Sequence, residues 1–160
     1  MTAFIGHDVT YSGTVTAAME AVITGCVPGI AVSLDAPENH SGHLDYSTAA
    51  KVARKVTAKV MADSLPDGVF LNINVPYLTY EQCKGIMVTR QGLRVYLDKL
   101  ERRVDPRGRP YYWIGGESPT GILEEGTDFG ALKAGYISIT PLQLDLTALA
   151  ALDVLKKWTW

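Results

Sequence analysis

Apolar positions in the first half of the chain alternate between helical and extended spacing. They recur at helical spacing over residues 15–22, just after Ser12, whose side chain suits a helix N-cap. Residues 28–34 form a short apolar run, as strands buried on both faces do. Helical spacing returns over 49–60, and a second apolar run covers 69–75. This order is typical of βαβ units, so we predict an α/β fold with a partly parallel sheet flanked by helices.

The second half contains a segment with a different pattern. Residues 86–90 and 111–114 resemble strands, and between them lie the charged stretch 98–105 and the turn Asp105-Pro106-Arg107-Gly108. We interpret this segment as an extended β-hairpin arm. Guanidinium groups and aromatic rings mix over residues 102–113, a combination that suits stacking on a base and holding a phosphate.

The C-terminal region predicts a strand and a helix. Residues 136–140 have strand character, and we expect Pro141 to end that strand. Residues 147–157 have helical character. Trp158 and Trp160 follow, and such apolar surface predicts a tail that docks either onto its own body or onto a neighbouring subunit.

Composition narrows the class of protein. The 160 residues suffice for one structural domain, in which we assign 1–84 to the α/β core and 85–160 to the arm, the returning strand and a C-terminal oligomerisation helix. The net charge of -2 gives no basic surplus, which argues against long nucleic acid as a partner. Cys26 and Cys83 form no CxxC pair. No apolar run approaches the roughly 20 residues that span a bilayer, and no signal-peptide layout occurs, so we expect a cytoplasmic protein without a membrane partner.

Several spaced motifs resemble, in order, those of the survival protein E (SurE) family of nucleotidases. The first is Asp8-Val9-Thr10-Tyr11-Ser12-Gly13-Thr14-Val15. The others are 17–20 (AAME), 31–33 (AVS), 72–76 (NINVP), 88–92 (VTRQG), 105–116 (DPRGRPYYWIGG), 126–128 (GTD), 135–142 (GYISITPL) and 145–147 (DLT). The resemblance covers nearly the whole chain and corresponds to the C-terminal two-thirds of a family member.

The resemblance implies a three-layer Rossmann-like fold and an enzyme that hydrolyses nucleoside 5'- or 3'-monophosphates. It also implies a divalent metal, Mg²⁺ or Mn²⁺, and assembly into a homodimer or homotetramer, for which the arm is the favoured element. Family members bind the metal through an Asn-Asp-Asp-Gly motif, a serine and a further asparagine. Residues 1–6 take the place just after that asparagine, so no metal ligand is assigned in this chain. We therefore expect the chain to be inactive as it stands; the alternative is a non-catalytic, truncated oligomerisation or binding module.

Ser12, Gly13 and Thr14 form the candidate phosphate site. They stand at the start of a predicted helix, where free backbone N–H groups and the positive end of the helix dipole favour an anion. Gly13 allows close approach, and the two hydroxyl groups are further donors. The alternative is that Ser12 only caps the helix.

The remaining candidates come from other segments. Asp8, in a predicted loop over residues 1–11, is the candidate catalytic group, because a carboxylate can orient a water. Asn72 and Asn74 point to the same face of one strand, where they bind substrate or, as an equal alternative, a neighbouring loop. We expect His7 to be exposed. Asp128, in a turn formed by residues 126–128, either contacts the active site or closes that loop.

Overall fold

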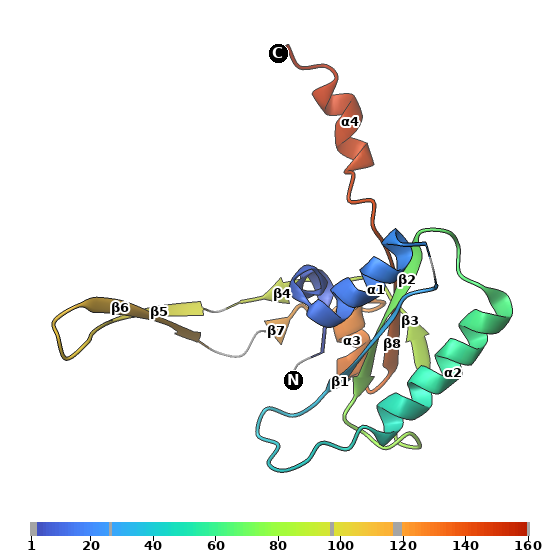
Figure 1. Ribbon diagram of the computed structural model, residues 1–160, viewed down its shortest axis with the longest axis horizontal. Helices are drawn as coiled ribbons and strands as arrows, with labels where there is room; N and C mark the ends of the chain where they lie inside the picture. The colour runs from blue at the N-terminus through green and yellow to red at the C-terminus, as the bar shows by residue number, and fades with distance from the viewer. Residues whose placement is uncertain (1–2, 26, 97, 117–119, 160) are drawn as a thin grey trace.

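A four-stranded sheet forms the centre of the protein. The computed structural model describes residues 3–25, 27–96, 98–116 and 120–159 (Figure 1). In the sheet the strands follow the order β1 (Ile30–Asp35), β2 (Val69–Pro76), β8 (Ile137–Gln143) and β3 (Ile86–Val88). β1 runs parallel to β2, β8 runs antiparallel to β2, and β3 runs parallel to β8. This mixed sheet confirms the predicted α/β fold.

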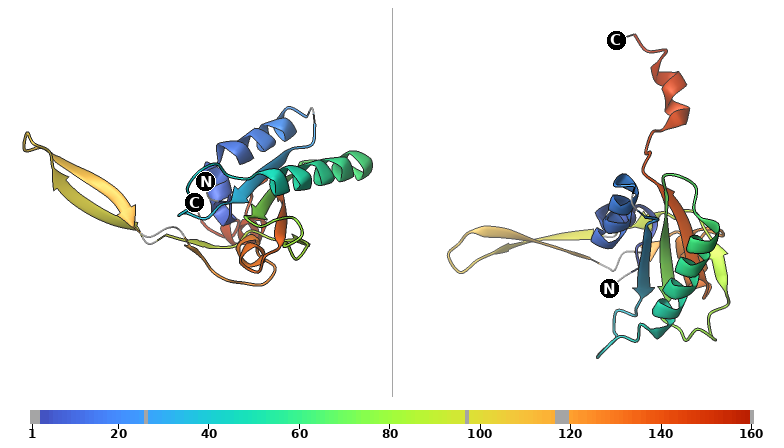
Figure 2. Two further views of the ribbon diagram at one scale, coloured as in Figure 1. Left: turned by 90° about the horizontal axis from the view of Figure 1, so that it is seen from below. Right: turned by 45° about the vertical axis from the view of Figure 1, so that its right-hand side comes forward.

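Helices cover the two faces of the sheet and make three layers (Figure 2). α2 (Ser47–Asp63) packs its valines 52, 56 and 60 on one face, against the side chains of Leu71, Ile73 and Val75. On the other face lie α1 (Gly13–Ile23), α3 (Asp128–Lys133) and the 3₁₀ helix η1 (Gly6–Tyr11). The apolar stripe of α2 explains its position, because each fully buried aliphatic side chain contributes about 1.5–3 kcal/mol.

The two faces of the sheet differ in polarity because strand residues alternate between them. Odd-numbered residues of β2 are apolar and meet α2, whereas Asn72 and Asn74 point to the other face. Beside them in the register lie Ser33, Ser138 and Thr140, which are also buried. This polar stripe lies beneath the segment that leads into α1.

The arm is a two-stranded hairpin, in which the predicted strand over 111–114 is confirmed but its partner is the charged stretch and not residues 86–90. β5 (Asp98–Val104) pairs antiparallel with β6 (Pro110–Gly116). The charged stretch is thus itself a strand, and residues 86–88 belong to the central sheet. Figure 1 shows the hairpin projecting away from the body, with β4 (Arg94–Val95) and β7 (Thr120–Gly121) pairing at its base.

Pro141 does not end the last strand, contrary to the prediction. The N–H of Ile137 donates to the carbonyl of Gly85, and the carbonyl of Ile139 accepts from Thr89, so alternate residues of β8 face β3. Pro141 continues this alternation and also faces the β3 side of the strand. The pairing between β3 and β8 ends at Ile139, so no residue of β3 lies opposite Pro141. Its missing N–H therefore costs no ladder hydrogen bond.

The C-terminal helix α4 (Leu149–Leu155) confirms the helix predicted in this region, with shorter bounds. It points away from the sheet in both figures, and none of its residues is buried. Docking of the tail onto its own body is therefore not what the structure shows, and docking onto a neighbouring subunit stays a prediction. Trp160 lies outside the described residues. Within the described ranges, no helix is both long and apolar enough to cross a membrane.

Candidate functional site

Ser12 caps α1 as its sequence position predicted. Its Oγ accepts a hydrogen bond from the Val15 N–H at 3.2 Å, and its carbonyl accepts from the Thr16 N–H at 2.8 Å. Ser12 is buried, whereas Gly13 and Thr14 are exposed. The cap satisfies one of the free amides of the first turn and aligns the others along the helix axis.

The amides of Gly13 and Thr14 are the open part of this helix start. Neither N–H has a hydrogen-bond partner among the residues that the structure describes. A Cβ added at Gly13 would meet no atom within 4 Å, so the backbone is open to solvent on that side. Two unpaired N–H groups, on exposed residues at the positive end of an 11-residue helix, favour an anion.

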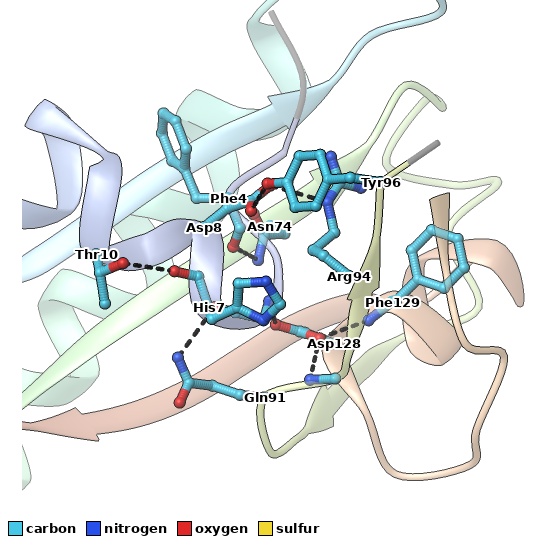
Figure 3. Close-up of polar contacts among 12 residues, drawn as sticks. Phe4, His7, Asp8, Thr10, Asn74, Gln91, Arg94, Tyr96, Asp128 and Phe129 are labelled. Atoms are coloured by element: carbon cyan, nitrogen blue, oxygen red, sulfur yellow. Dashed lines mark hydrogen bonds and ion pairs between the residues drawn. The ribbon is translucent and has the colours of Figure 1, made fainter. Parts of the chain in front are cut away.

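Asp8 lies in η1 rather than in a loop, which corrects the loop prediction over residues 6–11. Its carboxylate accepts a hydrogen bond from Arg94 Nε at 2.8 Å through Oδ2 and another from the Tyr96 hydroxyl through Oδ1 (Figure 3). The Arg94 side chain is 4% exposed and that of Asp8 19%. Both oxygens of the candidate catalytic group are thus engaged by protein donors, an arrangement we call the Asp8 clamp.

The clamp raises the pKa of Tyr96, chiefly because its hydroxyl donates to Asp8 and that bond is lost on ionisation. The difference in 295 nm absorbance between the wild type and Tyr96→Phe reports the ionisation of Tyr96. We expect its midpoint to lie at a higher pH than that of an ordinary tyrosine, whose pKa is about 10. Because the folded pKa is the raised one, stability from this bond is complete below about pH 10 and is lost as pH rises through the folded pKa.

In an Asp8→Asn background the Tyr96 titration should move back toward pH 10. A Tyr96 titration that in the wild type is already centred at the ordinary tyrosine pKa of about 10 would contradict the clamp.

Asp128 is the first residue of α3, not part of a turn, and it is fully buried. Its Oδ2 accepts from the Gly6 N–H at 2.7 Å, and its Oδ1 accepts from Gly92 at 2.7 Å and Phe129 at 2.8 Å (Figure 3). Gln91 adds a hydrogen bond from Nε2 to the Gly6 carbonyl at 3.0 Å. Asp128 thus joins the start of η1 to the segment before β4.

Asn72 and Asn74 are fully buried and hold the chain just before η1. Their side-chain amides donate to the Phe4 carbonyl at 2.7 and 3.0 Å, and Asn74 Oδ1 accepts from Ser33 Oγ at 2.5 Å. Among the described residues, Asn72 Oδ1 has no hydrogen-bond partner. The structure thus shows the loop contact named as one alternative, and substrate contact stays a prediction.

Sequence reasoning missed Arg94 and Tyr96. Their spacing offered one clue, because residues two apart in an extended segment project on the same side, and Tyr96 directly follows the strand that contains Arg94. The partner at residue 8 is 86 positions away and gave no local signal. His7 is exposed, as predicted, with its ring centre 6.2 Å from that of Tyr96.

The carboxylates of this region do not fit a divalent metal. Magnesium and manganese require several oxygen ligands, whereas Asp8 and Asp128 are occupied by N–H and O–H donors. No group of three or more His, Cys, Asp or Glu side chains suited to a metal occurs in the described part of the chain. The free thiol of Cys83 has a pKa raised by burial, which makes it a poorer ligand, and Cys26 lies outside the described residues.

Known proteins share both the sequence and the fold. The sequence model of the family described as "Survival protein SurE" matches residues 2–98. The 5'-nucleotidase SurE of Chloroflexus aggregans is 47% identical over 156 residues, which cover 98% of this chain and 60% of the relative. The protein of that name from Geobacter sulfurreducens is 49% identical over 154 residues, covering 96% and 57%. The crystal structure of the SurE protein from Aquifex aeolicus matches with a TM-score of 0.81 and 43% identity, covering 97% of this chain and 60% of that protein.

The chain therefore spans about 60% of the length of these relatives. The family match extends over more than half of the chain, from before η1 to the start of the arm. The relatives cover nearly all of the rest, including α3 and β8. The resemblance read from the motifs is confirmed, and the chain belongs to the SurE family.

Proposed function

We propose that this protein takes part in the hydrolysis of nucleoside 5'- or 3'-monophosphates to nucleoside and phosphate, and that the start of α1 binds the phosphate. The observation that carries this proposal is the pair of open amides at Gly13 and Thr14. Relatives that share almost half of its residues are named 5'-nucleotidases. A small phosphate ester also fits a chain with a net charge of -2, which has no surplus of basic groups for a polyanion.

Each residue of the turn has a distinct part in the proposal. Ser12 keeps the first turn in shape through its bond to Val15, and Gly13 leaves room for a phosphate oxygen against the backbone. The exposed Thr14 hydroxyl is a further donor. In this proposal Asn72 and Asn74 support the site indirectly, because their hydrogen bonds hold Phe4 in place ahead of η1.

The test measures release of inorganic phosphate from AMP in the presence of Mn²⁺. It compares the chain alone with the chain extended by the N-terminal part of the Aquifex aeolicus relative, including an Asn-Asp-Asp-Gly segment. We expect phosphate release from the extended protein and none above the blank from the chain alone. An extended, folded protein that releases no phosphate would refute the proposal.

Thr14→Val in the extended protein tests the assigned site. Losing one hydrogen bond to a charged ligand should weaken phosphate binding about tenfold. The control is Thr57→Val, which alters an exposed threonine of α2 and should leave binding unchanged. Equal affinities in the two variants would place the phosphate elsewhere.

A non-catalytic oligomerisation module is the second candidate, and the arm favours it. Tyr112, Trp113 and Ile114 of β6 are exposed on a hairpin that projects from the body. The Arg103 guanidinium lies over the Trp113 ring at 5.9 Å, so this cation is already paired with an aromatic ring of its own hairpin. A dimer or tetramer by light scattering, with no phosphate release from the extended protein, would favour this candidate.

A further inference from the structure

The segment that leads into α1 is tethered at every second residue by side chains from other elements. Asn72 and Asn74 hold the Phe4 carbonyl, and Asp128 holds the Gly6 N–H. The Asp8 clamp makes the third tether. Among the described residues, Asp8 is the last one before Ser12 that takes side-chain hydrogen bonds from a distant part of the chain.

The chemistry of the clamp indicates that it fixes geometry. A buried ion pair contributes little net stability, because desolvation of both groups offsets their attraction. Arg94 and Asp8 nevertheless lie largely out of solvent, with Tyr96 added as a second donor to the same carboxylate. Two donors of fixed direction, one to each oxygen, determine both the position and the rotation of the carboxylate.

The position of the Asp8 carboxylate affects the start of α1 through the next residue, Val9. The Ser12 N–H donates to the Val9 carbonyl at 3.3 Å, so the residue after Asp8 is bonded to the cap of α1. Val9 is buried against Val15 in the same apolar cluster. A shift of Asp8 therefore moves the cap, and with it the direction of the Gly13 and Thr14 amides.

We propose that Arg94 and Tyr96 are positioning residues, which hold Asp8 and through it orient the open amides at the start of α1 toward a bound phosphate. This inference rests on the proposed phosphate site and adds the residues that pre-organise it. It also assigns Asp8 a role through position, since both of its oxygens already accept hydrogen bonds.

Tyr96→Phe is the decisive variant, because it removes one hydroxyl from a side chain that is 44% exposed and leaves the ion pair in place. Binding of inorganic phosphate is followed through the amide NMR signals of Gly13 and Thr14. We expect the dissociation constant to rise about three- to tenfold, with the midpoint of urea unfolding nearly unchanged. Tyr46→Phe, an exposed tyrosine directly before α2, is the matched control and should change neither quantity.

A second variant tests whether the hydroxyl acts through Asp8. Asp8→Asn combined with Tyr96→Phe should weaken phosphate binding less than the product of the two single effects. Unchanged affinity in Tyr96→Phe, with the wild type binding phosphate at these amides, would overturn the inference.

Failure of the phosphate site itself would look different. In that case the wild-type signals of Gly13 and Thr14 would not move with phosphate, and amide hydrogen exchange at Val15 and Thr16 decides the positioning role. Both amides are bonded to Ser12. We expect Tyr96→Phe to speed their exchange about tenfold relative to Tyr46→Phe, and equal rates would refute positioning independently of any ligand.

Discussion

Gly6→Ala is expected to lower the free energy of unfolding by about 3 kcal/mol or more, as measured by urea denaturation. Gly6 has φ +56°, in the left-handed region where a side chain costs about 1–2 kcal/mol. A Cβ there would also lie 2.4 Å from the Gly92 carbonyl oxygen, which belongs to backbone and cannot rotate away. The clash pushes η1 off the segment before β4 and breaks the Asp128 bonds that join the two.

Gly25→Ala separates these two causes. Gly25 has a similar φ of +66°, but a Cβ there would meet nothing within 4 Å. This variant should therefore lose only about 1 kcal/mol, the cost of the backbone conformation. If the two variants lost the same amount, the close contact between Gly6 and Gly92 would not exist in solution.

The sequence was sufficient where structure depends on neighbours along the chain. α1 and α2 were predicted because their apolar residues repeat with the helical period, and β1 and β2 were predicted because each is a short run of apolar residues. The arm was misassigned for the opposite reason. β5 is exposed to solvent along most of its length, so its charged residues follow no period that marks a buried face.

In the candidate site, too, the sequence predicted the local features and not the contacts between distant segments. The cap at Ser12 and the open start of α1 are local features, and the sequence predicted the cap directly. Arg94 lies 86 positions from Asp8, and Asp128 lies 122 positions from Gly6. No local pattern specifies such pairs, because only the folded sheet brings η1 beside β4 and α3.

Asp128→Ala is expected to lower the free energy of unfolding by about 3–5 kcal/mol. The carboxylate accepts three backbone N–H groups, two of them from segments far away in the sequence. Asp128 is fully buried, so its removal leaves these N–H groups without this acceptor, and each buried group left unpaired costs about 1–3 kcal/mol. Asp128→Asn retains one carbonyl oxygen and should lose less, about 1–3 kcal/mol.

Asp67→Ala is the control for this loss, because Asp67 is an exposed residue of a turn and its replacement should change stability by no more than about 0.5 kcal/mol. The order Asp67→Ala, Asp128→Asn, Asp128→Ala in increasing loss follows from the count of acceptors removed from buried donors. An Asp128→Ala variant as stable as Asp67→Ala would mean that water satisfies the Gly6 and Gly92 amides. In that event η1 would not be fixed to α3, and the tethers at Phe4 and Asp8 alone would have to place the start of α1.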